Sequence, residues 1–477
     1  MTSTSAEIPQ NQQGNPGTIN VEALRQAVNS SFDRTVASLK DLVAIPGIAW
    51  PSFDPAQLER SADAVAELVR AAGIEDVQIL RCDKEDGTPG GPAVVARRQA
   101  APGKPTILLY AHHDVQPPGD SALWESEPFT AEERNGRLYG RGAADDKAGI
   151  MAHLAAHAAV AEVLGSGFGL GVTFFFEGEE EAGSPTFRTF LETHRELLRA
   201  DVIVVADSSN WKVGVPALTT SLRGLVDGTF EVRVLEHAVH SGMFGGPVLD
   251  APTLLSRLIA TLHDDDGNVA VAGLVARDEV DVDLTEAEYR ADASVLNGVR
   301  LAGSGTIASR LWTKPALSII GIDAPAVDVA SNTLIPSARA KFSMRLAPGQ
   351  DPQSAMDAMR QHVESHAPFG ARVTFTPGES GNAFSTDTTS PAARIAMWAL
   401  GESWGVKAVE MGIGGSIPFI ADLTEMYPEV QILVTGVEDP DSRAHSANES
   451  LHLEDFRHAV LAEALMLARL NAEGLGG

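Results

Sequence analysis

The sequence has little cysteine and comparatively few basic residues. Cys82 is the single cysteine among 477 residues, which excludes intramolecular disulfides and metal sites built from several cysteines. Lysine and arginine number 36 against 64 acidic residues, and the formal net charge of -28 would repel phosphate backbones and anionic lipids. We therefore expect no binding to nucleic acid or to membranes, and any metal site must use His, Asp and Glu side chains.

The sequence also lacks an obvious export or membrane segment. The first residues have neither the basic start nor the apolar core of a secretory signal. We also expect that no later apolar run is long enough to cross a bilayer. We interpret residues 1–19 as a disordered tail on a cytoplasmic protein.

Two kinds of strand pattern divide the rest of the chain into two predicted domains. Residues 20–218 and 379–477 contain apolar runs that are typical of strands buried on both faces, such as AVVAR, TILLYAHHD, GVTFFFEGE, ADVIVVADS and VQILVTG. They predict an α/β domain with a mainly parallel sheet sandwiched by helices. Residues 219–378 alternate apolar and polar positions, which predicts an inserted α+β domain with one wet sheet face.

Histidine or carboxylate side chains follow four separate predicted strands. Ligands of an open α/β sheet lie at the carboxyl ends of its strands, so these side chains should meet at one edge. The residues after the four strands are His112, Asp114, Glu177, Glu179, Glu180, Glu181, Asp207 and His445.

Each of these residues also has a simpler interpretation. The run Glu179–Glu181 could be solvated or form the first turn of a helix. Asp145 and Asp146 could cap the following helix, and Asp207 and His445 could lie in ordinary turns or loops. The simpler interpretations do not predict that all of them meet at one sheet edge.

Two histidines and three carboxylates suit a pair of divalent ions. One carboxylate could be shared between two ions about 3.5–4 Å apart. Zinc is the first candidate, and the same ligands accept manganese or cobalt. A further carboxylate next to the ions could deprotonate water, so two adjacent glutamates, one ligand and one base, would meet both needs.

Six short motifs now resemble those of one enzyme family. In chain order they are YAHHDVQP, LYGRGAADDKAG, EGEEEAGS, ADSSNW, HSGMFGG and AHSANE. They resemble the co-catalytic zinc metallopeptidases, which include carnosinases, bacterial dipeptidases, glutamate carboxypeptidases, acetylornithine deacetylase and succinyl-diaminopimelate desuccinylase. The resemblance spans roughly Leu39 to the C-terminus, and the inserted domain looks most like that of the carnosinase and dipeptidase branch.

The resemblance implies a ligand set for two zinc ions per chain. Asp145 would bridge the two ions. His112 and Asp207 would complete one site, and Glu181 and His445 would complete the other.

The resemblance also implies supporting roles around the ions. Glu180 would be the general base, and Asp114 would serve catalysis by orienting the His112 ring through its far nitrogen. His113 would point to the other side of the strand as a structural residue. The peptide bond between Asp145 and Asp146 would be cis.

The dipeptidase branch implies a set of substrate contacts. His240 would donate to the developing oxyanion. Asn332 and Arg345 would hold the backbone and the terminal carboxylate of the substrate, and Gly415 and Ser416 would lie near the same carboxylate. Arg345 could equally be a charge on the wet face of its strand.

The inserted domain would act as a lid or dimerisation domain, as in the dimeric relatives of this branch. There the equivalent of His240 reaches the active site of the partner subunit, whereas monomeric relatives supply it from the same chain. Two positions depart from the branch: Ile413 stands where an acidic residue is usual, and Ala148 replaces a glycine. We therefore name no particular substrate.

The resemblance implies a metal-dependent hydrolase that cleaves dipeptides or short peptides with a free C-terminal carboxylate. An N-acyl amino acid deacylase or a carboxypeptidase would use the same metal site with a different pocket. A metal-binding scaffold protein without turnover is a more remote alternative, because such proteins often lose the base and Glu180 is present.

Overall fold

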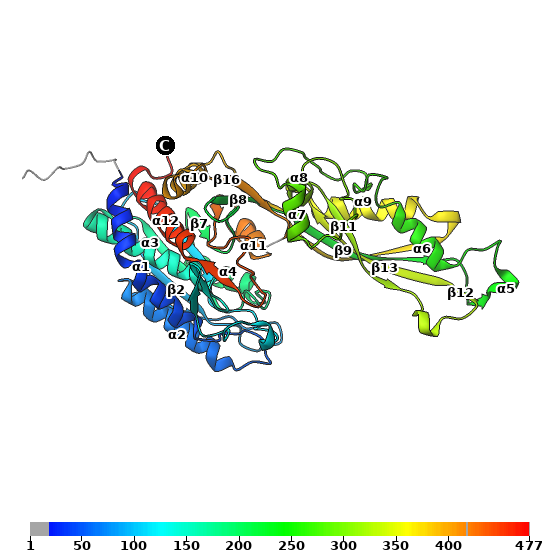
Figure 1. Ribbon diagram of the computed structural model, residues 1–477, viewed down its shortest axis with the longest axis horizontal. Helices are drawn as coiled ribbons and strands as arrows, with labels where there is room; N and C mark the ends of the chain where they lie inside the picture. The colour runs from blue at the N-terminus through cyan, green and yellow to red at the C-terminus, as the bar shows by residue number, and fades with distance from the viewer. Residues whose placement is uncertain (1–18, 416–417, 477) are drawn as a thin grey trace, which may run out of the picture.

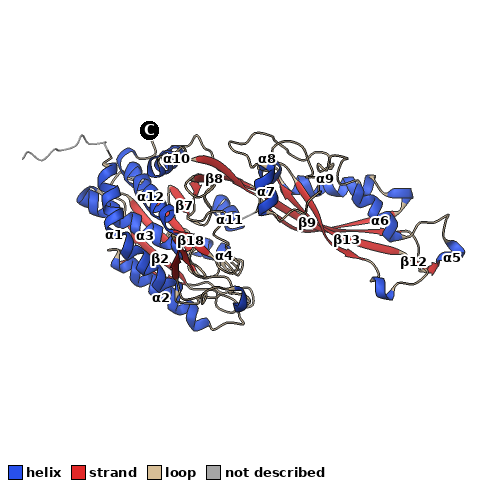
Figure 2. Ribbon diagram, viewed as in Figure 1, coloured by secondary structure: helices blue, strands red, loops and turns tan. Residues whose placement is uncertain are grey.

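The computed structural model describes residues 19–415 and 418–476, which form two lobes joined end to end (Figure 1). The predicted tail lies outside the described residues except for Ile19, which packs against the core. Figure 2 shows that the first lobe is a sheet between layers of helices, and that the second lobe extends away from it.

A mixed sheet of nine strands, counted within the described residues, forms the centre of the first lobe. Its central strands run parallel to one another in the order β6 (Gly171–Glu177), β3 (Thr106–His112), β7 (Val202–Val205) and β17 (Gln431–Val434). The flanking strands each pair antiparallel with their neighbours: β2 (Ala93–Arg98) and then β1 (Asp76–Leu80) on one side, β8 (Ala217–Leu222) and then β15 (Phe384–Ser385) on the other. β16 (Val409–Ile413) pairs with β8 in parallel.

Helices cover both faces of this sheet. The helices on one face are α1 (Val21–Val43), α2 (Pro55–Ala71), α3 (Lys147–Leu164), α10 (Pro391–Trp404) and α12 (Leu453–Glu473). The other face carries α4 (Phe187–Thr193) and α11 (Pro418–Met426). Leu109 packs with the first group and its neighbour Leu108 with the second, as expected for a strand buried on both faces. The predicted α/β fold is confirmed, with its parallel strands at the centre of a mixed sheet.

One apolar helix corrects the prediction that no run is long enough to span a membrane. The segment Lys147–Gly167, which contains α3, passes by length and composition. It is a core helix, because 67% of its apolar window is buried and it packs against α1 and α12.

The inserted domain is a four-stranded antiparallel sheet with two helices on one face. Its strand order is β11 (Ala316–Asp323), β13 (Ser337–Leu346), β9 (Gly224–Arg233) and β14 (Arg372–Gly381). The helices are α6 (Ala251–Ala260) and α9 (Pro352–Ser365), which begin at the predicted caps Asp250 and Asp351. The far end carries β10 (Val239–His240), α5 (Ser241–Phe244) and β12 (Thr333–Leu334) (Figure 1).

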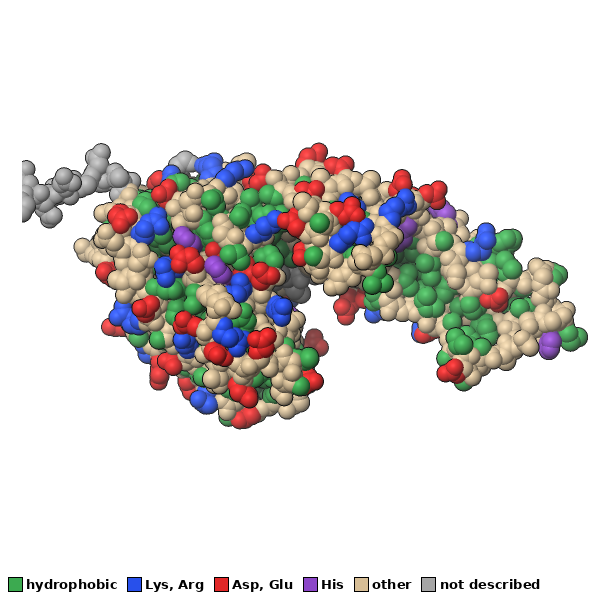
Figure 3. Space-filling model, in the orientation of Figure 1, with side chains coloured by type: hydrophobic (Ala, Val, Ile, Leu, Met, Phe, Trp, Pro, Cys, Tyr) green, Lys and Arg blue, Asp and Glu red, His purple; other side chains and the backbone are tan. Residues whose placement is uncertain are grey.

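Two chain crossings form the joint that connects the lobes, and helices α7 (Glu286–Asp292) and α8 (Ile307–Trp312) of the inserted domain also contact the first lobe. The chain crosses at Arg223, between β8 and β9, and returns between β14 and β15. We propose these crossings as the domain boundaries, a few residues later than the predicted 218/219 and 378/379. α8 packs back onto β16, and α7 is tied to the first lobe by the Lys212–Glu288 ion pair. Figure 3 shows the surface hollowed between the lobes.

Candidate active site

The predicted metal ligands come from five segments and lie close together at the carboxyl edge of the central strands. His112 ends β3, Glu180 and Glu181 follow β6, and Asp207 follows β7. Possible ligand atoms within 4.8 Å of one another form two groups: His112, Asp145 and Glu181, and His112, Glu180 and Asp207. His112 belongs to both groups, so they form a single cluster.

Asp145 lies between the two predicted ligand histidines. Its Oδ1 is 3.0 Å from His112 Nε2, and its Oδ2 is 3.0 Å from His445 Nε2. His445 Nε2 is also 3.2 Å from Glu181 Oε2. A carboxylate with one oxygen toward each half of a cluster is the arrangement that a bridging ligand requires. The donor set therefore fits two divalent cations.

Asp114 orients both His112 and the glutamate loop. His112 Nδ1 is 3.0 Å from the Asp114 carbonyl oxygen and 3.4 Å from Asp114 Oδ1. Because Nδ1 faces two oxygens, it keeps its proton when a metal binds, and Nε2 is the nitrogen that would bind the metal. The Asp114 carboxylate accepts the backbone N–H groups of Glu180 and Glu181, each at 3.1 Å.

The two adjacent glutamates are held in different ways. Both oxygens of Glu181 accept hydrogen bonds from Gln116, one from its backbone N–H at 3.1 Å and one from Nε2 at 2.6 Å. Within the described residues, no group donates a hydrogen bond to the Glu180 carboxylate, which lies 4.0 Å from His112 Nε2. Glu181 is fixed as a ligand would be, and Glu180 keeps the freedom to exchange a proton.

The metal-free cluster has strongly perturbed titration behaviour. Burial alone would lower the pKa of His112, but hydrogen bonds to Asp114 and Asp145 raise it well above its ordinary value. Hydrogen bonds to Asp145 and Glu181 raise the pKa of His445 to about 11. Burial raises the pKa of Glu180 to about 9 and that of Asp207 to about 7. Divalent cations would lower these pKa values by favouring the deprotonated ligands.

Glu449 holds the backbone at Asp145 and was not predicted. Its carboxylate accepts the backbone N–H groups of Ala144 at 3.0 Å and Asp145 at 3.1 Å. Arg141 Nη1 donates to its second oxygen at 2.5 Å. Glu449 lies in the AHSANE motif, so its place four residues after His445 was the available signal.

The simpler interpretations fail for Glu179 and Asp146. Glu179 is buried, and it accepts backbone N–H groups from Gly91 at 2.7 Å and Thr186 at 2.9 Å, so the acidic run is not a solvated one. Asp146 makes no side-chain cap to α3 and instead accepts the His112 backbone N–H at 3.2 Å. The Asp145–Asp146 peptide bond is cis. His113 is buried, with Nε2 at 2.7 Å from the Pro92 carbonyl oxygen.

The structure separates the predicted substrate contacts into two places. His240 and Asn332 lie together at the far end of the inserted domain, where the Ser241 N–H donates to Asn332 O at 3.0 Å. Both side chains are exposed. Arg345 lies at the near end, since it pairs with Leu225 next to the joint, and Gly415 follows β16 there. Ser416 lies outside the described residues.

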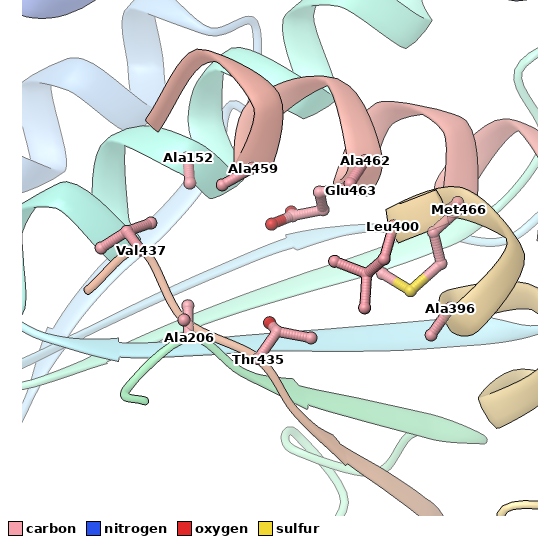
Figure 4. A pocket seen from close by; sticks show the side chains of 12 residues that line it. Ala152, Ala206, Ala396, Leu400, Thr435, Val437, Ala459, Ala462, Glu463 and Met466 are labelled. Atoms are coloured by element: carbon pink, nitrogen blue, oxygen red, sulfur yellow. The ribbon is translucent and has the colours of Figure 1, made fainter. Parts of the chain in front are cut away.

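An apolar cavity in the first lobe is lined by residues of α3, α10 and α12 and by the segments that follow β7 and β17. The space in it that water-sized molecules can occupy is about 30 Å³, and Figure 4 shows Glu463 among the alanine side chains that line it. Glu463 is hydrogen-bonded to His153, whose Nδ1 lies 2.8 and 2.9 Å from the two carboxylate oxygens of Glu463. None of the predicted ligands or substrate contacts lines this cavity.

The fold and the cluster together define a hydrolase class with a two-cation centre at the carboxyl edge of an α/β sheet. The model of peptidase family M20/M25/M40 matches residues 108–469, and the chain belongs to this family. The predicted family resemblance is confirmed, and the chain is a metallopeptidase.

Individual relatives agree with the predicted branch. A cysteinylglycine-S-conjugate dipeptidase of Corynebacterium striatum is 35% identical over 78% of this chain and 83% of its own. A Beta-Ala-His dipeptidase of Rattus norvegicus is 28% identical over 91% of this chain and 92% of its own. The crystal structure of human carnosine dipeptidase 1 has a TM-score of 0.72 at 24% identity and covers 96% of this chain and 100% of its own, which shows the shared fold.

Proposed function

We propose that this metallopeptidase hydrolyses dipeptides or short peptides with a free C-terminal carboxylate, using two divalent cations. The observation that carries the proposal is the placement of Asp145, whose two oxygens lie 3.0 Å from His112 and 3.0 Å from His445. The dipeptidases among its relatives support the substrate class. We also propose a cytoplasmic location, in which its single cysteine, Cys82, would stay reduced.

His112, Asp145 and Asp207 would hold one cation, and Asp145, Glu181 and His445 the other. The ligands suit zinc, with manganese or cobalt as alternatives. When bound, the cations polarise the substrate carbonyl and lower the pKa of water.

Glu180 would act as the base. Its carboxylate would take the proton of the attacking water and pass it to the leaving amine. Burial raises the pKa of Glu180 to about 9 in the metal-free protein, and cations nearby would bring it toward neutrality, where a base and acid works best.

His240 would donate a hydrogen bond to the developing oxyanion. Its Nδ1 accepts the Gly242 N–H at 3.0 Å, so the neutral ring carries its proton on the exposed Nε2. Because His240 and Asn332 lie at the end of the inserted domain away from the cluster, we propose that they serve the site of a partner subunit in a homodimer formed through the inserted domain.

Arg345 would bind the terminal carboxylate with two parallel hydrogen bonds, and the backbone amide of Gly415 would lie beside it. Its place next to the joint supports this role. A substrate would then lie between the near end of the inserted domain and the cation cluster.

An assay with dipeptides, N-acylated amino acids and longer peptides, each with added zinc and manganese, tests the proposal. We expect the highest kcat/KM with dipeptides. Preference for acylated amino acids would favour a deacylase, preference for longer peptides would favour a carboxypeptidase, and no turnover in any arm would favour a scaffold protein.

A further inference from the structure

Arg141 is a buried arginine that was not among the predicted site residues. It lies in the turn before α3, and it is 1% exposed. Its Nη1 donates to Glu449 Oε2 at 2.5 Å, and its Nη2 donates to Pro117 O at 3.4 Å and to Ser446 O at 3.3 Å. One guanidinium group therefore joins its own turn to two loops that are far apart in the sequence.

Two of these contacts lead to ligands of the same proposed cation. Glu449 accepts the backbone N–H of Asp145 at 3.1 Å. Ser446 directly follows His445, whose backbone φ of 62° is left-handed, a conformation that is costly for a residue other than glycine. The His445 side chain is also 59% exposed, so packing alone does not fix this loop, and the hydrogen bond from Arg141 restrains it.

The third contact leads to the remaining ligand of that cation. Pro117 follows Gln116 in the chain, and both oxygens of Glu181 accept hydrogen bonds from Gln116. Because the Pro117 carbonyl accepts from Arg141, the chain is held immediately after Gln116. Arg141 thus supports the backbone near every proposed ligand of this cation.

The cation proposed for His112 and Asp207 depends on the central sheet instead. His112 is the last residue of β3, a strand that pairs with β6 on one side and with β7 on the other, and it is fully buried. Asp207 follows β7 in the same sheet. Sites built on strands are held more precisely than sites built on loops. These two ligands therefore depend less on Arg141 than Glu181 and His445 do.

We propose that Arg141 is a positioning residue for the cation that Asp145, Glu181 and His445 would hold, and that loss of Arg141 weakens this site far more than the other. The inference rests on the proposed two-cation function and adds to it an asymmetry between the two sites. Arg141 acts through the loops that carry or hold the ligands, so its effect on the other cation is limited to the shared Asp145.

The test measures zinc affinity at each site separately, in two backgrounds that each keep one complete set of ligands. Asp207→Ala removes a ligand of one cation, and His445→Ala removes a ligand of the other. Arg141→Met in the Asp207→Ala background should weaken zinc binding about 10- to 100-fold, because outer hydrogen bonds orient the ligands. In the His445→Ala background the same substitution should change the affinity less than about 3-fold. Competition with a chromophoric chelator measures each dissociation constant.

Arg98→Met is the matched control. Arg98 is a half-buried arginine that donates to the Phe168 carbonyl oxygen, and it pairs with Val172 at the end of the sheet away from the cluster. Its substitution should leave both affinities at the values of the backgrounds. Arg141→Lys keeps the charge without the planar fork, so its loss should be smaller than that of Arg141→Met.

Equal losses in the two backgrounds, or an unchanged affinity in the Asp207→Ala background, would overturn the inference while the two-cation function stands. If circular dichroism shows that Arg141→Met does not fold, Arg141→Lys is judged by the same comparison. A metal-replete wild type that binds one zinc ion or none would overturn the proposed function and this inference with it.

Discussion

Glu180 and Glu181 are neighbours that are held by different hydrogen bonds, so their proposed roles as base and as metal ligand can be tested separately. Gln116 holds both oxygens of Glu181, and within the described residues nothing holds the carboxylate of Glu180. Glu180→Gln should keep both cations and lower kcat by roughly 10²- to 10⁴-fold, because only the proton transfer is lost. Glu181→Gln should lose metal first. Elemental analysis measures the metal content of each variant, and steady-state kinetics measures its kcat.

Near-normal turnover in Glu180→Gln would contradict its role as the base. Metal loss in both variants would mean that the two roles have been assigned to the wrong neighbours. One cation or none in metal-replete wild type would contradict the two-cation centre itself.

Metal binding should release protons. The raised pKa values of His112 and His445, about 11 for the latter, mean that both rings are protonated at neutral pH in the metal-free protein. A cation must displace these protons, so metal affinity should rise with pH and fall in acid. Calorimetric titration with zinc in two buffers of different ionisation enthalpy measures the number released, and identical heats in both buffers would contradict the prediction.

At the scale of elements, the apolar segments predicted the positions of the strands in the sequence but not their directions in the sheet. The run of β6 is buried throughout and that of β2 over its first four residues, yet β2 is antiparallel to β6 whereas β3 is parallel to it. A run buried on both faces has the same pattern in either direction, so its direction depends on the connections around it. The short sheet β18 (Ser450–His452), β5 (Arg137–Tyr139) and β4 (Glu132–Arg134) was missed because three residues carry no readable period.

The sequence likewise predicted part of the candidate site: the side chains that form it, but not the hydrogen bonds that hold them. Side chains that follow strands could be located from the sequence, and the structure brings His112, Asp145, Glu181 and Asp207 into one cluster. Hydrogen bonds to backbone groups, such as those that Glu449 accepts from Ala144, depend on loop geometry that no residue pattern encodes.

The stability of the packing between α12 and α3 should depend on the buried Glu463–His153 pair that links them. His153 Nε2 also contacts Tyr110 O at 2.9 Å, so the ring ties α3 to β3. Glu463→Ala should lower the free energy of unfolding by about 1–3 kcal/mol, because it leaves a buried ring nitrogen without a partner. Glu463→Gln should cost less.

Denaturant unfolding of the metal-loaded proteins measures this effect. Metal content should stay at the wild-type value in both variants, since neither touches the cluster. Equal stability of Glu463→Ala and wild type would show that the pair does not hold the helices together.

At the scale of the whole molecule, the position of His240 predicts that active sites are completed between chains. His240→Ala and Glu180→Gln should each be nearly inactive as homodimers. After mixing in equal amounts with subunit exchange, half of the dimers are mixed, and each of these has one site with an intact Glu180 and an intact His240. Activity should recover to roughly a quarter of the wild-type value.

Native mass spectrometry can confirm the exchange. A mixture that stays as inactive as its components after exchange would contradict the contribution of His240 from the partner. Wild type mixed with Glu180→Gln is the control, because its activity should follow the fraction of intact Glu180.

The insertion of one domain within another also determines the order in which the protein can fold on the ribosome. The inserted domain is one continuous segment whose first and last strands, β9 and β14, pair with each other, so it is complete soon after Gly381 is synthesised. The catalytic sheet still lacks β15, β16 and the central strand β17 at that moment, and α12, which packs on α1 and α3, is made after all of them. The nascent first lobe must therefore keep its apolar strands from aggregating until α12 is made, so this lobe, and not the inserted domain, is where chaperone dependence and misfolding should concentrate.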